Sequence, residues 1–409
     1  MPDYRDVDIE EFRHLVSDRA LRGETMLLNM GPQHPSTHGV LRLLLELDGE
    51  IIINCIPDIG FLHTGIEKTM ESKIYQKAEV LTDRIDYMNN AGNNLVFCLA
   101  LEKLIELDVP PRAQAIRVIL AELTRLSDYM LWLGTSALDL GAMSVYFFTM
   151  QDRERIMDIM EMCSGQRMMT TFIRPGGVWR DVPAEFEDTL RGFLKDMPGR
   201  IDKYEALLTK NPIFLDRTRN VGVITTEQCL EWGISGPILR ATGMAYDVRK
   251  VRPYSGYEQY DFEVPTADSG DIFGRYMVRM QEFRQTLRII QQALDTMPAG
   301  RVRSQNRKFV PPPRSEIGVS MEALIHHFKL WTDGFPAPSG AVYVGTESPH
   351  GELGVFMEGD GSHKGRRIHF NTPSFANLQV MALMAKGHFV GDLVGIIAST
   401  DIVLGDVDR

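Results

Sequence analysis

This chain has few cysteines, and their spacing excludes the common metal sites. Its 409 residues include four cysteines, Cys55, Cys98, Cys163 and Cys229, and no two of them form a CxxC pair. Zinc and iron–sulfur sites need several thiolates close together, which cysteines so far apart do not supply. We therefore predict four reduced, mostly buried thiols, and no metal or covalently bound cofactor held by this chain alone.

Other absences restrict the function further. No apolar run approaches the roughly 20 residues needed to span a bilayer, so any membrane association must come through partners. No GxGxxG or GxxxxGK loop is present, so we expect no NADH or ATP to bind to this chain itself. A formal net charge of -11 argues against a nucleic-acid partner, because phosphate binding needs clustered Lys and Arg.

The N-terminal sequence, MPDYRDVDIEEFRHL, is acidic and polar. It resembles neither a secretory signal nor an Arg-rich transit peptide, and its paired Glu10 and Glu11 are expected to be solvated. These features indicate a cytoplasmic location.

The hydrophobic patterns predict an α+β fold with a central helical bundle and small β elements near both termini. Alternating leucines from Leu41 to Leu47 and the Asp48-Gly49 turn predict a small sheet within residues 25–56. After Pro110-Pro111, apolar residues recur at helical spacing up to Leu133, and the end of this helix is apolar nearly all round, which is typical of a helix inside a bundle. Further helices are predicted over Arg153–Cys163, Pro183–Leu208 and Phe273–Thr296.

The C-terminal quarter follows a different pattern. The proline-rich segment Pro298–Arg314 cannot continue a helix and predicts an extended connector. Short strands are then predicted at Ala341–Val344, Gly354–Met357 and Arg367–Phe370, followed by a helix near Leu378–Ala385. We therefore divide the chain into a β-rich segment (1–68), a helical bundle (69–300) and a connector with an α+β return (301–409), all in one functional unit.

The segment Gly31–Gly39, GPQHPSTHG, is the first candidate site. It holds His34 and His38 in a turn bounded by Gly and Pro, directly before a strand. Histidine titrates nearest physiological pH, so such a turn suits a ligand that gains or loses protons. We rank His38 above His34, because one of two histidines in a turn is commonly a satisfied structural residue.

The segment LTDRIDYMNNAGNN supplies a second candidate pair. If it is helical, Arg84 and Tyr87 lie on one face, where the phenol could donate a proton and the guanidinium could stabilise negative charge. The same spacing also fits a packed tyrosine beside a surface cation, which is the commoner arrangement, and the pattern leaves both interpretations open.

Long motifs along nearly the whole chain carry a family resemblance. They are GPQHPSTHGVLRL, FLHTGIEKTME, GQRMMTTFIRPGGV, YDVRKVRPYSGYE and the closing GDVDR. In these the chain resembles the D subunit of the proton-pumping NADH:quinone oxidoreductase, respiratory complex I, of the nickel–iron hydrogenase large-subunit superfamily.

The hydrogenase relatives show what this chain has lost. Where they carry Arg-x-Cys-Gly-x-Cys, this chain has Arg84–Asn89, and where they end in Asp-Pro-Cys-x-x-Cys-x-x-His, it has Asp401–Arg409, without cysteine. Nickel–iron coordination needs thiolates. The resemblance therefore implies a hydrogenase-like frame without its metal centre, with a cavity between the two segments for another ligand.

In the complex I family this cavity forms the quinone headgroup pocket with the B subunit, which carries the terminal [4Fe–4S] cluster. The resemblance implies that His38 and Tyr87 bind the headgroup and that Asp139 is the carboxylate that pairs with His38. A quinone accepts electrons and protons, so proton donors at its oxygens fit this role. The resemblance also places Arg84 near the terminal cluster, and His34 in the loop or by the cluster region.

The resemblance has further consequences. It implies that the chain is active only within a complex that includes B, C, I and membrane H subunits, bound peripherally on the cytoplasmic side of a bacterial inner membrane and coupled to proton transport. Met169 stands where relatives often have a histidine, so the potential of the cluster is expected to depend only weakly on pH. Thr64 replaces an arginine of mitochondrial members, which favours a bacterial origin. The quinone, ubiquinone or menaquinone, is left open.

Two other functions fit parts of the pattern. The first is a non-catalytic, hydrogenase-derived scaffold that docks iron–sulfur subunits. The second, an active hydrogenase, is disfavoured by the missing thiolates. The remaining histidines have no ligand spacing and are predicted to be surface or packing residues: His63, His326, His327, His350, His363, His369 and His388.

Overall fold

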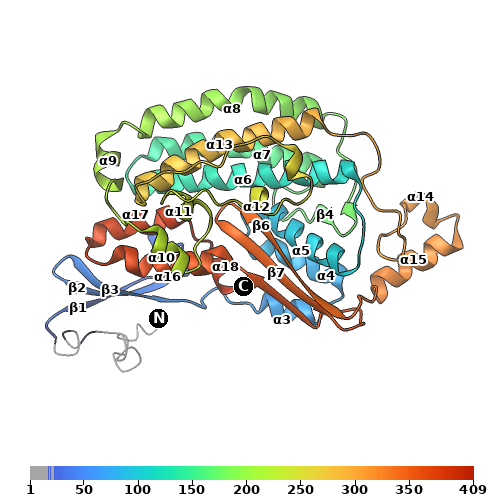
Figure 1. Cartoon of the computed structure of the whole chain (residues 1–409), viewed down its shortest axis with the longest axis horizontal. Helices are drawn as coiled ribbons and strands as arrows, with labels where there is room; N and C mark the ends of the chain where they lie inside the picture. Colours follow the sequence, from blue (N-terminus) through green and yellow to red (C-terminus); the bar gives the residue numbers. More distant parts are fainter. Residues whose placement is uncertain (1–16, 18, 20–22) are drawn as a thin grey trace.

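The computed structural model describes residues 17, 19 and 23–409, and it has an α+β fold of long helices with small sheets (Figure 1). Residues 1–16 lie outside the described residues. They include Glu10 and Glu11, which we predicted to be solvated. Among the described residues, no helix combines the length and the apolar character that crossing a membrane requires.

A layer of long helices forms one side of the molecule, where α6, α7, α8 and α13 run side by side (Figure 1). The long helices are α5 (Asn90–Leu104), α6 (Pro111–Asp139), α7 (Met143–Ser164), α8 (Phe186–Leu208) and α13 (Ile272–Asp295). Helix α6 begins at Pro111, whose missing N–H costs nothing in the first turn, and most of its side chains are buried. The predicted helices are confirmed, with ends shifted by a few residues, except that α7 begins well before Arg153.

Short elements connect these helices. They are α9 (Pro212–Thr218), α10 (Thr226–Glu231), α11 (Gly236–Arg240), α12 (Val248–Val251), η3 (Tyr257–Gln259) and the hairpin of β4 (Ile173–Arg174) with β5 (Gly177–Val178). Between the first sheet and α5 lie α3 (Ile66–Glu71), α4 (Tyr75–Ala78) and the 3-10 helix η2 (Glu79–Arg84).

The predicted N-terminal sheet is confirmed as three antiparallel strands. They are β1 (Met26–Met30), β2 (Arg42–Asp48) and β3 (Ile51–Asp58), and the short turn after Asp48 joins β2 to β3. The leucines of β2 share a core with two C-terminal helices, α16 (Pro373–Ala385) and α17 (Val390–Thr400). The two ends of the chain are therefore packed together.

The predicted C-terminal strands are confirmed as a second antiparallel sheet. It consists of β6 (Gly340–Ser348), β7 (Gly351–Gly359) and β8 (Arg367–Asn371), and it packs against α5. The chain then ends in α18 (Leu404–Asp408). The sequence patterns did not predict three of the helices: α14 (Arg314–Ile317), α15 (Met321–Thr332) and α17. Helices α14 and α15 project from the end of the helical layer (Figure 1).

Candidate functional site

The turn Gly31–Gly39 is held by its own polar groups. His34 caps the 3-10 helix η1 (Pro35–Thr37), because its Nδ1 accepts the N–H of Ser36 at 3.2 Å. The hydroxyl of Thr37 donates to the carbonyl of Pro32 at 3.2 Å, and a Cβ on Gly31 would stand 2.2 Å from the carbonyl oxygen of Leu41. His34 is thus a structural part of the turn.

His38 follows η1 in the left-handed conformation, with φ 56°, and its N–H donates to the carbonyl of Pro35. Part of its side chain is exposed, and within the described residues no hydrogen bond engages its ring. Burial of the rest of the ring lowers the pKa of His38, and the nearby carboxylate of Asp401 opposes this shift.

Asp139, at the end of α6, has a different histidine as its neighbour. Burial raises the pKa of Asp139, and His34 opposes this shift. We predicted that Asp139 pairs with His38, but in this structure the charge that acts on His38 belongs to Asp401. The predicted pairing of Asp139 with His38 therefore stays a prediction, and the charge effects in this structure pair Asp139 with His34 and His38 with Asp401.

Arg84 is the last residue of the 3-10 helix η2, and residues 85–89 form a turn, so the condition for a shared helix face of Arg84 and Tyr87 is not met. The carboxylate of Asp86 accepts the N–H groups of Met88 and Asn89, at 3.1 and 3.2 Å, which stabilises a turn before α5 begins. Arg84 is exposed and Tyr87 is half-buried. Burial, followed by the charge of Asp86, raises the pKa of Tyr87, which therefore keeps its proton at neutral pH.

The C-terminal segment Asp401–Arg409 packs directly on this turn. A Cβ on Gly405 would lie 2.5 Å from the carbonyl oxygen of Ile85 and 3.3 Å from a ring carbon of Tyr87. Asp408 accepts the N–H groups of Gly60 and Leu62, at 2.9 and 2.7 Å. The structure thus brings together three segments that the sequence singled out: the turn with His38, the segment with Tyr87 and the C-terminus.

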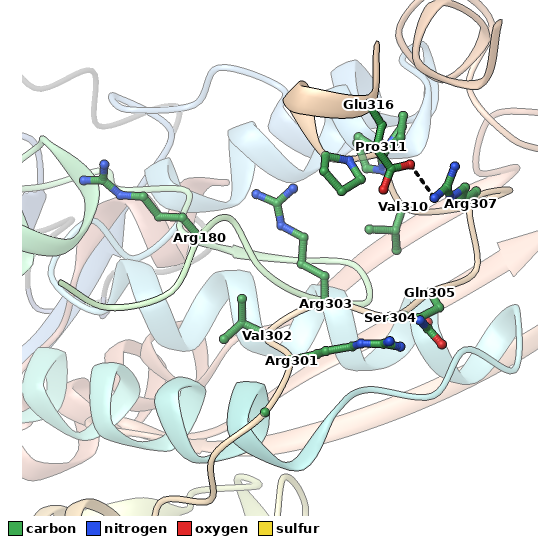
Figure 2. A pocket seen from close by; sticks show the side chains of 13 residues that line it. Arg180, Arg301, Val302, Arg303, Ser304, Gln305, Arg307, Val310, Pro311 and Glu316 are labelled. Atoms are coloured by element: carbon green, nitrogen blue, oxygen red, sulfur yellow. Dashed lines mark ion pairs between the residues drawn. The ribbon is translucent and has the colours of Figure 1, made fainter. Parts of the chain in front are cut away.

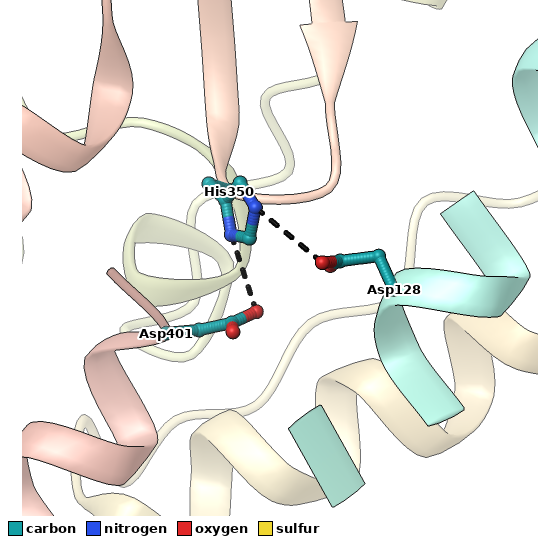
Figure 3. Close-up of side chains that lie close together, drawn as sticks. All are labelled: Asp128, His350 and Asp401. Carbon is teal, nitrogen blue, oxygen red and sulfur yellow. Dashed lines mark ion pairs between the residues drawn. The ribbon is translucent and has the colours of Figure 1, made fainter. Parts of the chain in front are cut away.

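A buried cluster lies where these segments meet, and its central residue is one that we predicted to be a surface or packing histidine. His350 is fully buried in the turn between β6 and β7. Its Nδ1 lies 3.2 Å from a carboxylate oxygen of Asp401, and its Nε2 lies 3.7 Å from one of Asp128 (Figure 3). The same Nε2 lies 3.3 Å from a carboxylate oxygen of Asp86. We call these four residues the His350 cluster. Sequence spacing gave no signal for it, because its members come from four distant segments.

The charges of the cluster are strongly coupled. Burial alone would lower the pKa of His350, but the surrounding carboxylates raise it well above its usual value. Burial raises the pKa of Asp128 well above its usual value, whereas His350 and Arg279 together hold that of Asp401 below it despite burial. These directions favour a protonated His350, an ionised Asp401 and a protonated Asp128.

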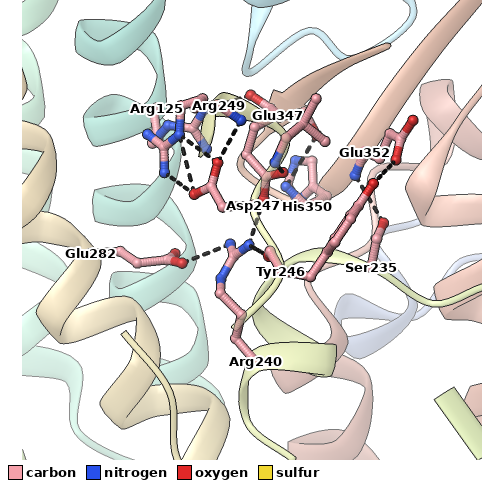
Figure 4. Close-up of polar contacts among 12 residues, drawn as sticks. Arg125, Ser235, Arg240, Tyr246, Asp247, Arg249, Glu282, Glu347, His350 and Glu352 are labelled. Atoms are coloured by element: carbon pink, nitrogen blue, oxygen red, sulfur yellow. Dashed lines mark hydrogen bonds and ion pairs between the residues drawn. The ribbon is translucent and has the colours of Figure 1, made fainter. Parts of the chain in front are cut away.

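A network of buried ion pairs lies behind the turn that carries His350 (Figure 4). Glu347, at the end of β6, pairs with Arg240 at 2.7 Å, and Arg240 also pairs with Glu282 of α13 at 2.6 Å. The amide of Asn377 in α16 donates to the carbonyl of His350 at 3.2 Å. These contacts join α13, α16 and the second sheet, so the position of His350 is fixed by the tertiary structure.

The donor set of the cluster resembles that of a metal site only in part. Donor atoms of Asp128, His350 and Asp401 lie within 4.8 Å of one another, so these three residues could hold a cation. However, the two ring nitrogens face carboxylates on opposite sides, which is the arrangement expected of an imidazolium, and a metal ligand must be an unprotonated nitrogen. The four cysteines are free and buried as predicted, and burial raises the pKa of each, so thiolates are not available either.

A separate basic cavity is lined mainly by the connector that follows α13. It has a volume of about 550 Å³, and its lining includes Arg180 and several arginines of residues 300–313 (Figure 2). Arg307 pairs there with Glu316. None of the predicted site residues lines this cavity, so it does not belong to the site at the cluster.

The chain is similar to known proteins along most of its length. The family described as "Respiratory-chain NADH dehydrogenase, 49 Kd subunit" matches residues 139–409. The NADH-quinone oxidoreductase D subunit 2 of Chloroflexus aurantiacus is 58% identical over 391 residues, which cover 95% of each chain. The corresponding D subunit 2 of Roseiflexus sp. is 56% identical over 96% of each chain, and the D subunit of Geotalea uraniireducens is 51% identical over 94% of this chain and 99% of its own.

Proposed function

Because this chain belongs to the family of the 49 kDa subunit of respiratory-chain NADH dehydrogenase, as a subunit of NADH:quinone oxidoreductase, we propose that it forms the quinone headgroup pocket of that enzyme. The pocket is shared with a partner subunit that carries a terminal [4Fe–4S] cluster. Quinone is the substrate there, and its reduction is coupled to proton translocation.

One observation carries this proposal. The turn with His38, the segment with Tyr87 and the C-terminal segment meet, although they lie at opposite ends of the sequence. The segment with Tyr87 and the C-terminal segment are those that correspond, by the resemblance, to the metal-binding segments of a hydrogenase, and this chain has no cysteine in them. We therefore infer that the place where these segments meet, which in a hydrogenase holds the metal, accepts an organic ligand in this chain.

The side chains present there suit a quinone. Burial lowers the pKa of His38, so its ring is mainly neutral at neutral pH and can donate one N–H to a carbonyl oxygen of the headgroup. Tyr87 has a raised pKa and donates its O–H. As charge develops on the substrate during reduction, each group can pass on its proton, and both then need to be protonated again. Arg84 is exposed three residues before Tyr87, and it supplies positive charge on the side proposed for the partner's cluster.

The remaining parts of the proposal concern the assembly. The chain binds the B subunit at the headgroup pocket and contacts C, I and membrane H subunits. The complex is attached to the cytoplasmic side of a bacterial inner membrane, where this chain is peripheral. The alternative is a scaffold that only docks iron–sulfur subunits, and it predicts that His38 and Tyr87 can be replaced without effect on quinone reduction.

Photolabelling tests the proposal directly. A photoreactive quinone-site inhibitor, bound to the assembled complex, should label this chain close to His38, Tyr87 and Asp139. The variant Tyr87→Phe should lower quinone turnover by about tenfold or more, because a proton donor is lost, while electron transfer to ferricyanide is retained. Tyr343→Phe, on β6, is the matched control. Labelling confined to another subunit, together with unchanged turnover in Tyr87→Phe, would favour the scaffold.

A further inference from the structure

The His350 cluster has more acidic groups than its cations can balance. Besides its own three carboxyl groups, Asp406 of α18 faces Asp86 and His350. Of the cations, His350 lies within the cluster, Arg279 of α13 lies 3.5 Å from Asp401, and Arg153 of α7 acts on Asp128 from farther away. Four carboxyl groups thus share three cations in a buried space, so ionisation of all four would leave a net negative charge. At least one carboxyl proton is therefore retained.

The polar atoms of the cluster also lack the hydrogen bonds that a purely structural network would have. Within the described residues, Oδ2 of Asp128 and Oδ1 of Asp406 are buried and accept no hydrogen bond. Structural networks of buried polar groups are normally fully satisfied. Oxygens left without donors in such a place are suited to take up and release protons.

The cluster is coupled electrostatically to both proposed quinone ligands. Asp401 contacts His350 at 3.2 Å and directly follows α17, which packs against η1, the 3-10 helix that precedes His38. Its charge acts on the His38 ring. Tyr87 is next to Asp86 in the chain, and its pKa responds to Asp86, His350 and Asp128. The two donors of the pocket therefore share one buried neighbour.

We propose that the His350 cluster stores a proton and supplies it through Asp401 to His38 when His38 and Tyr87 protonate the reduced quinone. This inference rests on the proposed function. Two electrons come from the partner's iron–sulfur cluster. One proton leaves the hydroxyl of Tyr87, which regains a proton from solvent. The second proton leaves one nitrogen of the neutral His38 ring as Asp401 delivers a proton to the other nitrogen, so no imidazolate forms. Asp401 takes that proton from the carboxyl of Asp128, and the cluster ends one proton poorer until it is refilled from solvent.

The cluster residues act through His38 and Tyr87, so they are positioning residues and not catalytic ones. Asp406 fits the refilling step, because burial and the charge of Asp86 raise its pKa to about 6, which lets it exchange protons near neutral pH. His350 retains its positive charge throughout and keeps Asp401 ionised and ready to accept.

The variant Asp128→Asn tests this proposal in the assembled complex. Asparagine has nearly the same shape but cannot release a proton, and ferricyanide reduction verifies that assembly and the earlier electron path are intact. Quinone turnover should fall by about tenfold at about pH 8, where solvent protons are scarce, and much less at about pH 6. His363→Asn, at an exposed histidine in the loop before β8, is the control that should leave the pH profile unchanged.

Infrared difference spectroscopy tests the unaltered complex as well. Reduction of the bound quinone should change a C=O stretching band of a protonated carboxyl group, and Asp128→Asn should remove that band. A wild-type pH profile in Asp128→Asn would overturn the proposal, as would the absence of such a band in the unaltered complex, even if the variant failed to assemble. A stoichiometric metal ion besides iron would overturn it in favour of a cation site. If photolabelling still reaches His38 and Tyr87, these results refute the proton store alone, and the proposed quinone pocket stands.

Discussion

Gly405 of α18 lies so close to the carbonyl oxygen of Ile85 that a Cβ at this position would be 2.5 Å from it. The oxygen belongs to the backbone and a Cβ is fixed to the backbone, so no side-chain rotation could relieve the overlap. This contact joins the C-terminal segment to the turn that carries Tyr87, and the geometry of the proposed pocket depends on it.

We predict that Gly405→Ala displaces α18 from this turn. The overlap should cost about 1 to 3 kcal/mol of stability and should weaken quinone turnover and inhibitor binding together. Thermal unfolding and inhibitor titration of the assembled complex measure the two effects. Gly192→Ala in α8 is the matched control, since a Cβ there meets nothing within 4 Å. Equal behaviour of the two variants would contradict the proposed role of the contact.

We predict a large loss of stability for Arg117→Met. Arg117 is fully buried in α6, and its guanidinium donates to Glu102 at 2.9 Å and to the carbonyl oxygens of Gly177 and Arg174 at 3.1 and 2.8 Å. The substitution leaves Glu102 buried without its cation, which should cost about 3 to 5 kcal/mol.

The control for this variant is an exposed arginine. Arg191 pairs with Glu187 and Asp295 on the surface of α8, where solvent screens the charges, so Arg191→Met should leave the stability nearly unchanged. Denaturant unfolding of the complex compares the two variants, and a similar midpoint for both would refute the prediction.

We predict that Glu79→Gln stabilises the protein at alkaline pH. Glu79 of η2 is buried, and burial raises its pKa well above 4.5. The folded chain thus favours the protonated carboxyl group, and this contribution is complete below pH 4.5 and is lost as the pH rises through the raised pKa. Glutamine is neutral at every pH, so the gain in melting temperature should be small at about pH 5 and larger at about pH 8. The exposed Glu187→Gln should show no such trend, and a gain that shrinks with rising pH would count against the prediction.

We predict that the potential of the partner's terminal cluster depends little on pH. Met169 follows Gln166-Arg167 at the place where relatives often have a histidine, and a thioether does not titrate. Its loop is close to Arg84, because the hydroxyl of Thr171 donates to the carboxylate of Asp83 at 2.6 Å. Redox titrations of the complex between about pH 6 and pH 8 measure the dependence, and Met169→His should introduce one. A steep dependence in the unaltered complex would show that another group titrates with the cluster.

The sequence by itself determined the local elements and the identity of the segments that matter. The leucine alternation of β2 and the apolar helix after Pro110 follow from periods of two and 3.6 residues, which depend only on neighbours in the chain. The long motifs likewise indicated the family, and the loss of cysteines from Arg84–Asn89 and Asp401–Arg409 is visible in the letters alone.

Only the tertiary structure decided which side chains meet. His34 and His38 occur in the same turn, yet one is used by the backbone and acts on Asp139 while the other faces Asp401. His350 has no sequence neighbour that hints at a role, and it gains one only because β6, β7, α6 and the C-terminus pack around it. Burial and the distances between charges set the protonation of such a group, and both arise from contacts between segments that are far apart in the sequence.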